Sequence, residues 1–143
     1  MAYAARSDIE SEFGVNEVAK WADLDNDGNT TSITNRITAR LADAEDAVDN
    51  ALRGGAYTVP FATVPTTITR ATAILAGVML FESRGHATDD QDDMNFPRHR
   101  LAQLEAYARR VLACIRAGIT TLDPGTWPKK LDIPATYSQS LPT

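Results

Sequence analysis

The chain has 143 residues, 43% of them hydrophobic, and its 19 acidic and 14 basic side chains give a formal net charge of −5. This length suits one domain with a modest core. The acidic balance argues against a protein that binds nucleic acid by neutralising phosphates. A single cysteine, Cys114, excludes an intramolecular disulfide. No stretch has the pattern of a signal peptide or a membrane span, so we expect a soluble protein that stays intracellular when it is made.

Capping signals place two short helices at the start of the chain. Ser7 followed three residues later by Glu10 is a capping box, and it predicts a helix that ends at Gly14. Asn16 can cap a second short helix. The residues 23–29 then form a turn rich in aspartate, asparagine and glycine, which breaks the helical pattern.

Three longer helices follow from hydrophobic periodicity. Apolar residues recur at three- and four-residue steps from Ser32 to the glycines at 54–55, from Pro65 to Gly85, and from near Pro97 to Gly118. The β-branched, proline-bearing link 56–64 should run extended, as a short strand or edge segment. The residues 86–95, with four aspartates, should form an exposed, mobile loop.

The segment after Gly118 holds four of the seven prolines and has no helical period. We therefore expect an all-α fold: a small bundle of three long helices plus short N-terminal helices, with an extended C-terminal arm. The domain boundaries that follow are 1–118 for the helical domain and 119–143 for the arm.

The aspartate-rich turn is the one candidate metal site. Oxygen ligands at alternate positions, with glycine sixth, are what a calcium loop needs. The candidate ligands are Asp23, Asp25, Asp27 and Asn29. The twelfth position, however, holds Thr34 in place of the usual bidentate glutamate. A solvated turn that leads into a helix capped by Ser32 explains the same residues, and both interpretations stay open.

No set of residues predicts catalysis. The two histidines, His86 and His99, lack metal-ligand spacing and a nucleophilic partner, so we interpret them as surface residues. Cys114 lies on the flank of a helix and is interpreted as a packing residue. The glycines at 54–55 end a helix and do not lead directly into another, so they form no phosphate cradle. We expect no enzyme and no cofactor, calcium excepted.

Charged residues are distributed unevenly between the last loop and the last helix. The loop carries Asp89, Asp90, Asp92 and Asp93 without a compensating lysine or arginine. The helix carries Arg98, Arg109 and Arg116, which lie within about 20° of one another on a helical wheel. Arg109 can also pair with Glu105, so part of this pattern is ordinary helix stabilisation. Our hypothesis is that the acidic loop of one subunit meets the basic flank of the next in a head-to-tail contact.

The C-terminal arm has more apolar residues than a disordered tail usually contains. They are Trp127, Leu131, Ile133, Tyr137 and Leu141. A disordered terminus remains the simple alternative. We favour an arm that orders on a neighbouring protein.

The order of these pieces resembles a phage family. The pieces are the opening Met-Ala-Tyr-Ala-Ala-Arg-Ser-Asp-Ile-Glu of residues 1–10, the turn at 23–29, Ala-Val-Asp-Asn-Ala-Leu at 47–52, and Tyr-Thr-Val-Pro-Phe at 57–61, followed by Val64-Pro65 and an apolar helix. Together, over residues 1 to about 118, they resemble the head–tail connector (adaptor, or head-completion) proteins of Mu-like and long-tailed phages. The chain departs from that pattern at 54–56, where relatives tend to carry a basic residue.

The resemblance implies a structural virion protein of the neck, assembled in the host cytoplasm. Such proteins are helical bundles that dock as a ring, commonly twelvefold, below the portal protein. The ring extends the DNA channel, and the tail or stopper protein assembles on it; DNA passes through without sequence-specific binding. Two other interpretations are a calcium-binding helical interaction module and a small DNA-binding regulator that uses the arginine-bearing helix. The acidic net charge disfavours the regulator.

Overall fold

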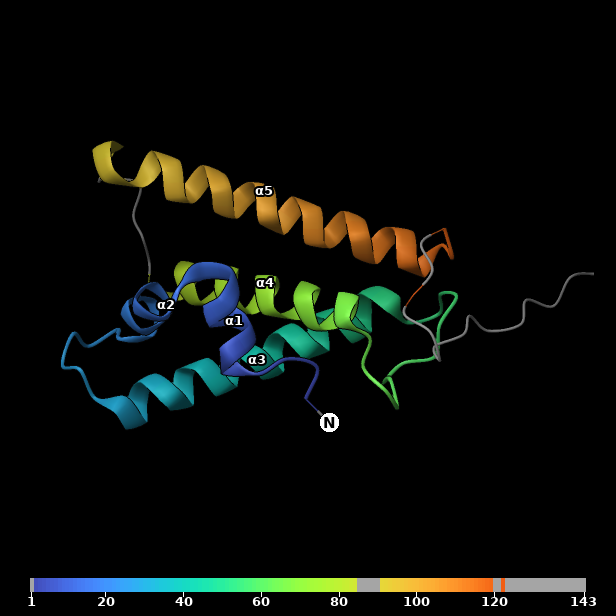
Figure 1. Cartoon of the computed structure of the whole chain (residues 1–143), viewed down its shortest axis with the longest axis horizontal. Helices are drawn as coiled ribbons and strands as arrows, with labels where there is room; N and C mark the ends of the chain where they lie inside the picture. Colours follow the sequence, from blue (N-terminus) through green and yellow to red (C-terminus); the bar gives the residue numbers. More distant parts are fainter. Residues whose placement is uncertain (1, 85–90, 120–121, 123–143) are drawn as a thin grey trace, which may run out of the picture.

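The computed structural model of the chain describes residues 2–84, 91–119 and 122, with the side chains of 91–99 left undescribed. Five helices account for its regular structure (Figure 1): α1 (Arg6–Phe13), α2 (Val15–Ala22), α3 (Thr30–Leu52), α4 (Thr66–Ser83) and α5 (Gln91–Arg116). The residues described contain no strand, which confirms the all-α expectation. None of these helices is both long and apolar enough to cross a bilayer.

Helix α4 lies at the centre of the fold. It contacts each of the other four helices, and in Figure 1 it runs between α5 and α3. Residues 71–78 are all buried, so this helix has no solvent-facing stripe along its middle. Thr72 is fully buried there, and its hydroxyl donates a 2.8 Å hydrogen bond to the carbonyl of Ile68. A helix that is apolar all round is expected to be surrounded by others.

A glycine in α4 lets α1 approach closely. A Cβ atom on Gly77 would lie 2.0 Å from Cε2 of Phe13, so only glycine fits against this ring. Phe13 continues into an aromatic chain, with edge-on contacts from Phe13 to Trp21 at 5.3 Å and from Trp21 to Phe81 at 5.5 Å between ring centroids. Aromatic pairs favour this geometry. The chain of rings joins α1, α2 and α4.

The helix starts differ from the predicted ones by a few residues. Helix α1 begins at Arg6, and the carboxylate of Asp8 accepts a 2.7 Å hydrogen bond from the N–H of Ala5, so Ser7 is not the cap. Helix α2 begins at Val15, directly after Gly14, so Asn16 does not cap it. Asn29 is the cap of α3, not Ser32, because its side chain accepts from two N–H groups of the first turn. Pro65 precedes α4 instead of lying within it.

The link between α3 and α4 forms bends and not the predicted strand. It is held by side chains that point inward. Tyr57 and Phe61 are buried, and the N–H of Ala56 donates a 2.9 Å hydrogen bond to the carbonyl of Arg116 at the end of α5. The N–H of Phe61 likewise donates a 2.9 Å hydrogen bond to the hydroxyl of Tyr3, so the link is attached to the fold at two points without a partner strand.

Helix α5 begins six residues before the predicted start at Pro97. The residues 91–95, predicted as part of a loop, belong to its first turns. Asp92 and Asp93 thus stand near the N-terminal end of a helix, where negative charge is favoured by the backbone dipoles. The periodicity of apolar residues could not show this, because those turns carry few of them.

The other end of α5 is where the sequence places it. Gly118 adopts φ +77°, and the N–H of Ile119 donates a 3.0 Å hydrogen bond to the carbonyl of Cys114. Glycine adopts positive φ without steric cost, which is why it ends helices. Beyond it, the backbone N–H of Leu122 donates a 3.2 Å hydrogen bond to the hydroxyl of Tyr57, and the Leu122 side chain is buried.

Candidate functional site

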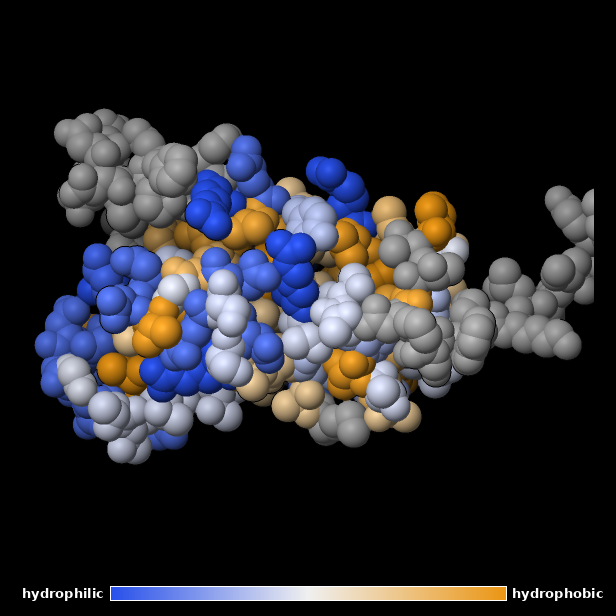
Figure 2. All heavy atoms as spheres, viewed as in Figure 1, coloured by the Kyte–Doolittle hydropathy of each residue, from blue (hydrophilic) through white to orange (hydrophobic). Residues whose placement is uncertain are grey.

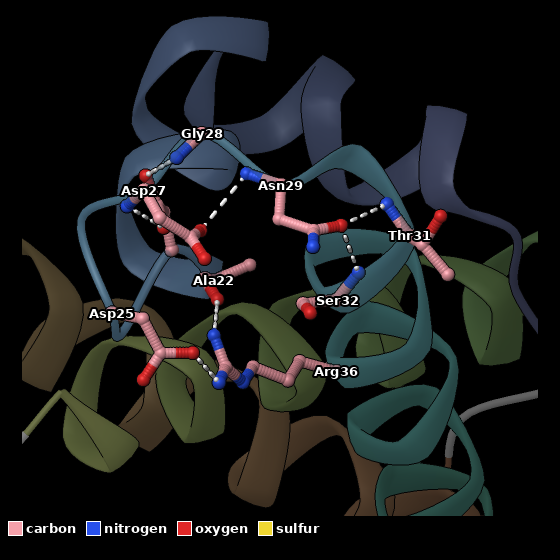
Figure 3. A network of polar contacts seen from close by, with 9 residues as sticks. Ala22, Asp25, Asp27, Gly28, Asn29, Thr31, Ser32 and Arg36 are labelled. Carbon is pink, nitrogen blue, oxygen red and sulfur yellow. Dashed lines mark hydrogen bonds and ion pairs between the residues drawn. The ribbon is translucent and has the colours of Figure 1, made fainter.

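The aspartate-rich turn between α2 and α3 is organised by its own side chains (Figure 3). The carboxylate of Asp23 accepts hydrogen bonds from the N–H groups of Asp27, at 3.2 Å, and Gly28, at 3.1 Å. Asp27 accepts in turn from the N–H of Asn29 at 2.9 Å. The Asn29 amide oxygen accepts from Thr31 at 3.0 Å and Ser32 at 3.2 Å. Each of these oxygens therefore stabilises the turn and the start of α3.

Two arginines tie this turn to the body of the protein. Arg36 of α3 donates to the carboxylate of Asp25 at 2.5 Å and to the carbonyl of Ala22 at 3.1 Å. Arg84, just after α4, donates to the Asn26 amide oxygen at 2.9 Å. The Arg36 guanidinium would compete with a cation for Asp25, because it is positively charged and already binds a carboxylate oxygen.

The structure gathers no three histidine, cysteine or acidic side chains with the geometry of a metal site among the residues it describes. The oxygens of Asp23, Asp25, Asp27 and Asn29 instead accept hydrogen bonds from the protein. Calcium at this turn would have to exchange those bonds for its own coordination. Calcium binding here stays a prediction.

Helix α5 presents a basic outer face. Arg109, Arg110 and Arg116 are all exposed, and Arg109 pairs with Glu105 at 2.9 Å, as the i,i+4 spacing predicts. Figure 2 shows hydrophilic side chains standing along α5, with hydrophobic surface in the seam below it. Arg110 has no ion pair or hydrogen bond with a side chain in the described part of the chain.

Several of the predicted contact residues fall where side chains or positions are not described. Asp92, Asp93 and Arg98 lie within α5, and their side chains are outside the described part of the structure. The remaining ones lie outside the described residues: Asp89, Asp90, Trp127, Leu131, Ile133 and Tyr137. The proposed acidic loop is corrected in one respect, since two of its four aspartates stand on the same helix as the arginines. Their contact with the basic flank stays a prediction.

A cavity of about 210 Å³ lies between the start of α4 and the middle of α5. Its charged group is Arg70, whose Nε donates to Glu12 Oε1 at 2.9 Å. The guanidinium carbon stands 5.3 Å from the centre of the Tyr107 ring, a cation–π distance. The hydrogen bond and the negative charge of Glu12 raise the pKa of the Arg70 guanidinium. Arg70 thus joins α1, α4 and α5 at the surface.

Sequence reasoning missed Arg70. The signal was present, because Arg70 is the one charged residue between Thr66 and Phe81, within an otherwise apolar and threonine-rich part of α4. A second cavity of about 150 Å³ was also missed; it is lined by Glu12, Phe13, Glu17, Trp21, Arg100 and Leu101. It combines the consecutive helices α1 and α2 with α5, which is far from them in the sequence, so no local pattern reveals it.

Comparison with known families decides what kind of protein this is. Residues 3–132 match the family model described as "Bacteriophage Mu, Gp36", which is almost the whole chain. The chain belongs to the bacteriophage Mu Gp36 family. As a member of the Mu Gp36 family it is a phage structural or morphogenesis protein. No curated protein matches the chain.

Proposed function

We propose that this member of the Mu Gp36 family is a head–tail connector subunit: a structural virion protein, not an enzyme, that works by assembly. It forms a ring below the portal protein, extends the DNA channel and provides the surface on which a tail or stopper protein assembles. The observation that carries the proposal is the family match over residues 3–132. The order of sequence pieces that resembles connector proteins supports the finer role.

The role is mechanical, and the charge of the chain suits it. With a net charge of −5, a ring of identical subunits repels the phosphates of DNA as a whole. DNA can then slide past without being held. The subunits act in the neck of the virion after assembly in the host cytoplasm, and the ring number in such a neck is commonly twelve.

Contacts between subunits and with the portal would use the charged and apolar residues singled out above. The arginine flank of α5, with exposed Arg109 and Arg116, supplies one side of a head-to-tail contact. The aspartates at 89–93 are candidates for the other side. The arm, with Trp127 and Tyr137, would order on a neighbouring protein.

The proposal is tested by assembly. The purified chain should form a closed ring by native mass spectrometry and electron microscopy, alone or when mixed with the purified portal protein. A strict monomer that binds no portal would contradict the proposal. Deletion of residues 123–143 should weaken attachment to the portal while leaving the helical content, measured by circular dichroism, unchanged. If attachment to the portal were unchanged, the proposed role of the arm would be wrong.

A calcium-binding interaction module is the second candidate, favoured by the spacing of Asp23, Asp25 and Asp27. Isothermal titration with calcium separates the two. Binding heat that disappears in the variant Asp23→Ala, but persists in Asp43→Ala on α3, would support the module. No heat at millimolar calcium would exclude it.

A further inference from the structure

The cavity between the start of α4 and the middle of α5 has the size and the access that an aromatic side chain needs. Its volume is about 210 Å³, and an internal cavity of about 150 Å³ is already large enough to bind benzene. Several of its lining residues are exposed, so it can be entered from solvent. The cavity is lined by Thr66, Thr67, Arg70, Ala71, Tyr107 and Val111.

Arg70 makes this cavity more suitable for a ring than for an anion. Its charge is balanced by the ion pair with Glu12 at 2.9 Å, so an anion would have to displace that carboxylate. The Tyr107 ring contacts one side of the guanidinium, with 5.3 Å from the guanidinium carbon to the ring centre. The Arg70 side chain is 53% exposed, which leaves room for a second ring on it. Tryptophan is the ring that binds a guanidinium most strongly.

Apolar surface is left open on the second half of α5 and directly after it. Tyr107, at 42%, and Ile119, at 77%, are two of the four exposed large hydrophobic residues in the described part of the chain. Figure 2 shows hydrophobic surface along the seam below α5, where α5 meets the helices under it. Exposed apolar side chains next to a cavity are typical of a binding surface.

The arm begins at the same end of the fold as this cavity. The side chain of Leu122 is buried, and its N–H donates to the hydroxyl of Tyr57. The neighbouring Ala56 is bonded to the carbonyl of Arg116, so Leu122 is held beside the last turn of α5. In Figure 1, the end of α5 and the start of α4 lie at the same end of the molecule.

Trp127 of the arm is close enough in sequence to reach the cavity. It follows Leu122 by five residues, and an extended chain of that length spans up to about 17 Å. Along α5, Val111 and Tyr107 stand only about 8 Å and about 14 Å before Arg116, at the helical rise per residue. Trp127 can therefore enter the cavity of its own subunit without any movement of the helices.

The family match includes this part of the arm. It covers residues 3–132, so it continues for ten residues beyond Leu122 and includes Trp127. The last eleven residues, 133–143, lie outside it. Pro124 and Pro128 stand on either side of Trp127 and restrict the backbone, so less conformational entropy is lost when the segment is bound.

We propose that Trp127 occupies the cavity at Arg70 in its own subunit. The indole ring packs on the guanidinium, and its N–H donates to the hydroxyl of Thr67. The short connection to Leu122 gives Trp127 a high effective concentration at this cavity, which favours it over the arm of another copy. The inference goes beyond the proposed function because it concerns the free subunit. A neighbouring protein that binds the arm would take Trp127 over from this cavity.

The test is the exposure of Trp127 to a quencher. The chain has two tryptophans, and Trp21→Phe leaves Trp127 as the one fluorophore of its kind. Acrylamide should quench Trp127 weakly in the folded full-length chain. In Val111→Phe the added ring fills the cavity, so quenching should rise to that of the chain unfolded in urea, and the emission should shift to longer wavelength. Both effects should be the same at every protein concentration.

Matched variants separate the cavity from general effects on α5. Arg70→Met keeps the length of the side chain but removes the guanidinium, and it should also raise the quenching of Trp127. Arg110→Met makes the same change at an exposed position that does not line the cavity, and it should leave quenching unchanged. Circular dichroism should show unchanged helical content in each variant. If Trp21→Phe lowers it, the difference in emission between the wild-type chain and Trp127→Phe reports the same environment.

Three outcomes would overturn the proposal. Equal quenching of Trp127 in the folded and the unfolded chain would mean that no site holds it. Protection that persists in both Val111→Phe and Arg70→Met would place Trp127 elsewhere on the subunit. Protection that appears only as the protein concentration rises would assign the cavity to the arm of another copy. Because the measurements use the free chain, they remain valid whether or not the chain forms a ring.

Discussion

The hydroxyl of Tyr3 donates a 2.5 Å hydrogen bond to the carboxylate of Asp49 in α3 and accepts a 2.9 Å bond from the N–H of Phe61. Tyr3 is almost fully buried, and its ring meets that of Phe61 edge-on at 5.8 Å. One side chain near the start of the chain therefore joins the second half of α3 to the link that follows it.

Removing this hydroxyl should destabilise the fold. The variant Tyr3→Phe keeps the ring but leaves the Phe61 N–H without its partner, and a buried unpaired group costs about 1–3 kcal/mol. The free energy of unfolding from urea titrations should fall by that amount. Tyr107→Phe is the matched control, because the Tyr107 hydroxyl is at the surface, 3.5 Å from Arg70. Equal stability of the two variants would contradict this account of Tyr3.

The same tyrosine predicts a loss of stability at high pH. Burial, and next the hydrogen bond to Asp49, raise the pKa of Tyr3 well above its ordinary value of 10.0. The folded protein therefore keeps the proton at pH values where the unfolded chain loses it. The stability due to Tyr3 is complete below pH 10 and decreases as the pH rises above it. Urea titrations between pH 8 and pH 11 should show a smaller decrease for Tyr3→Phe than for the wild-type chain.

The close approach of Phe13 to Gly77 predicts the sign of a helix substitution. In a helix interior, replacing glycine by alanine usually stabilises by about 1 kcal/mol. Here the added methyl group would overlap the Phe13 ring, which is held by Trp21, so repacking at about 1–3 kcal/mol should outweigh that gain. Gly77→Ala should lower the midpoint of thermal unfolding. The double variant Gly77→Ala/Phe13→Leu should recover part of the loss, and a midpoint raised by Gly77→Ala would refute the packing argument.

The turn at 23–29 predicts unequal roles for two of its polar residues. Asn29→Ala removes the cap of α3 and should cost about 1 kcal/mol. Asp25→Ala removes an ion pair to Arg36 that is largely exposed on the Asp25 side, and such pairs contribute about 0–1 kcal/mol. Urea titrations of the two variants should therefore rank Asn29→Ala as the more destabilising. The reverse order would show that the pair with Arg36 is the main support of the turn.

Hydrophobic periodicity identified where helices lie more reliably than where they begin. The apolar residues of α4 predicted a helix there, and Gly118 marked the end of α5. The residue at which a helix begins depends on which of several polar residues caps it, and in α3 the cap is Asn29 rather than Ser32. The first turns of α5 were predicted as a loop because their aspartates suggested solvent, although acidic residues are equally suited to a helix N-terminus.

Features built from several distant segments could not be predicted. The sequence predicted that the arginines of α5 share one flank of the helix, and in the structure Arg109 and Arg116 are both exposed. The cavity at Arg70 combines residues of α4 and α5 with a carboxylate of α1, so only the folded chain brings it together.

The link between α3 and α4 is hydrogen-bonded to both ends of the described chain: the N–H of Phe61 donates to the Tyr3 hydroxyl, and the Tyr57 hydroxyl accepts from the N–H of Leu122. In mechanical terms, these two bonds attach residues 3 and 122 to the same short segment between α3 and α4. A pulling force applied between residues 3 and 122 would therefore act first on this segment. It would act on α4 and on the aromatic chain around Gly77 only after the segment had yielded. Optical-tweezer extension between cysteines introduced at these two ends, with Cys114 replaced, should show an early small step before the helices unfold.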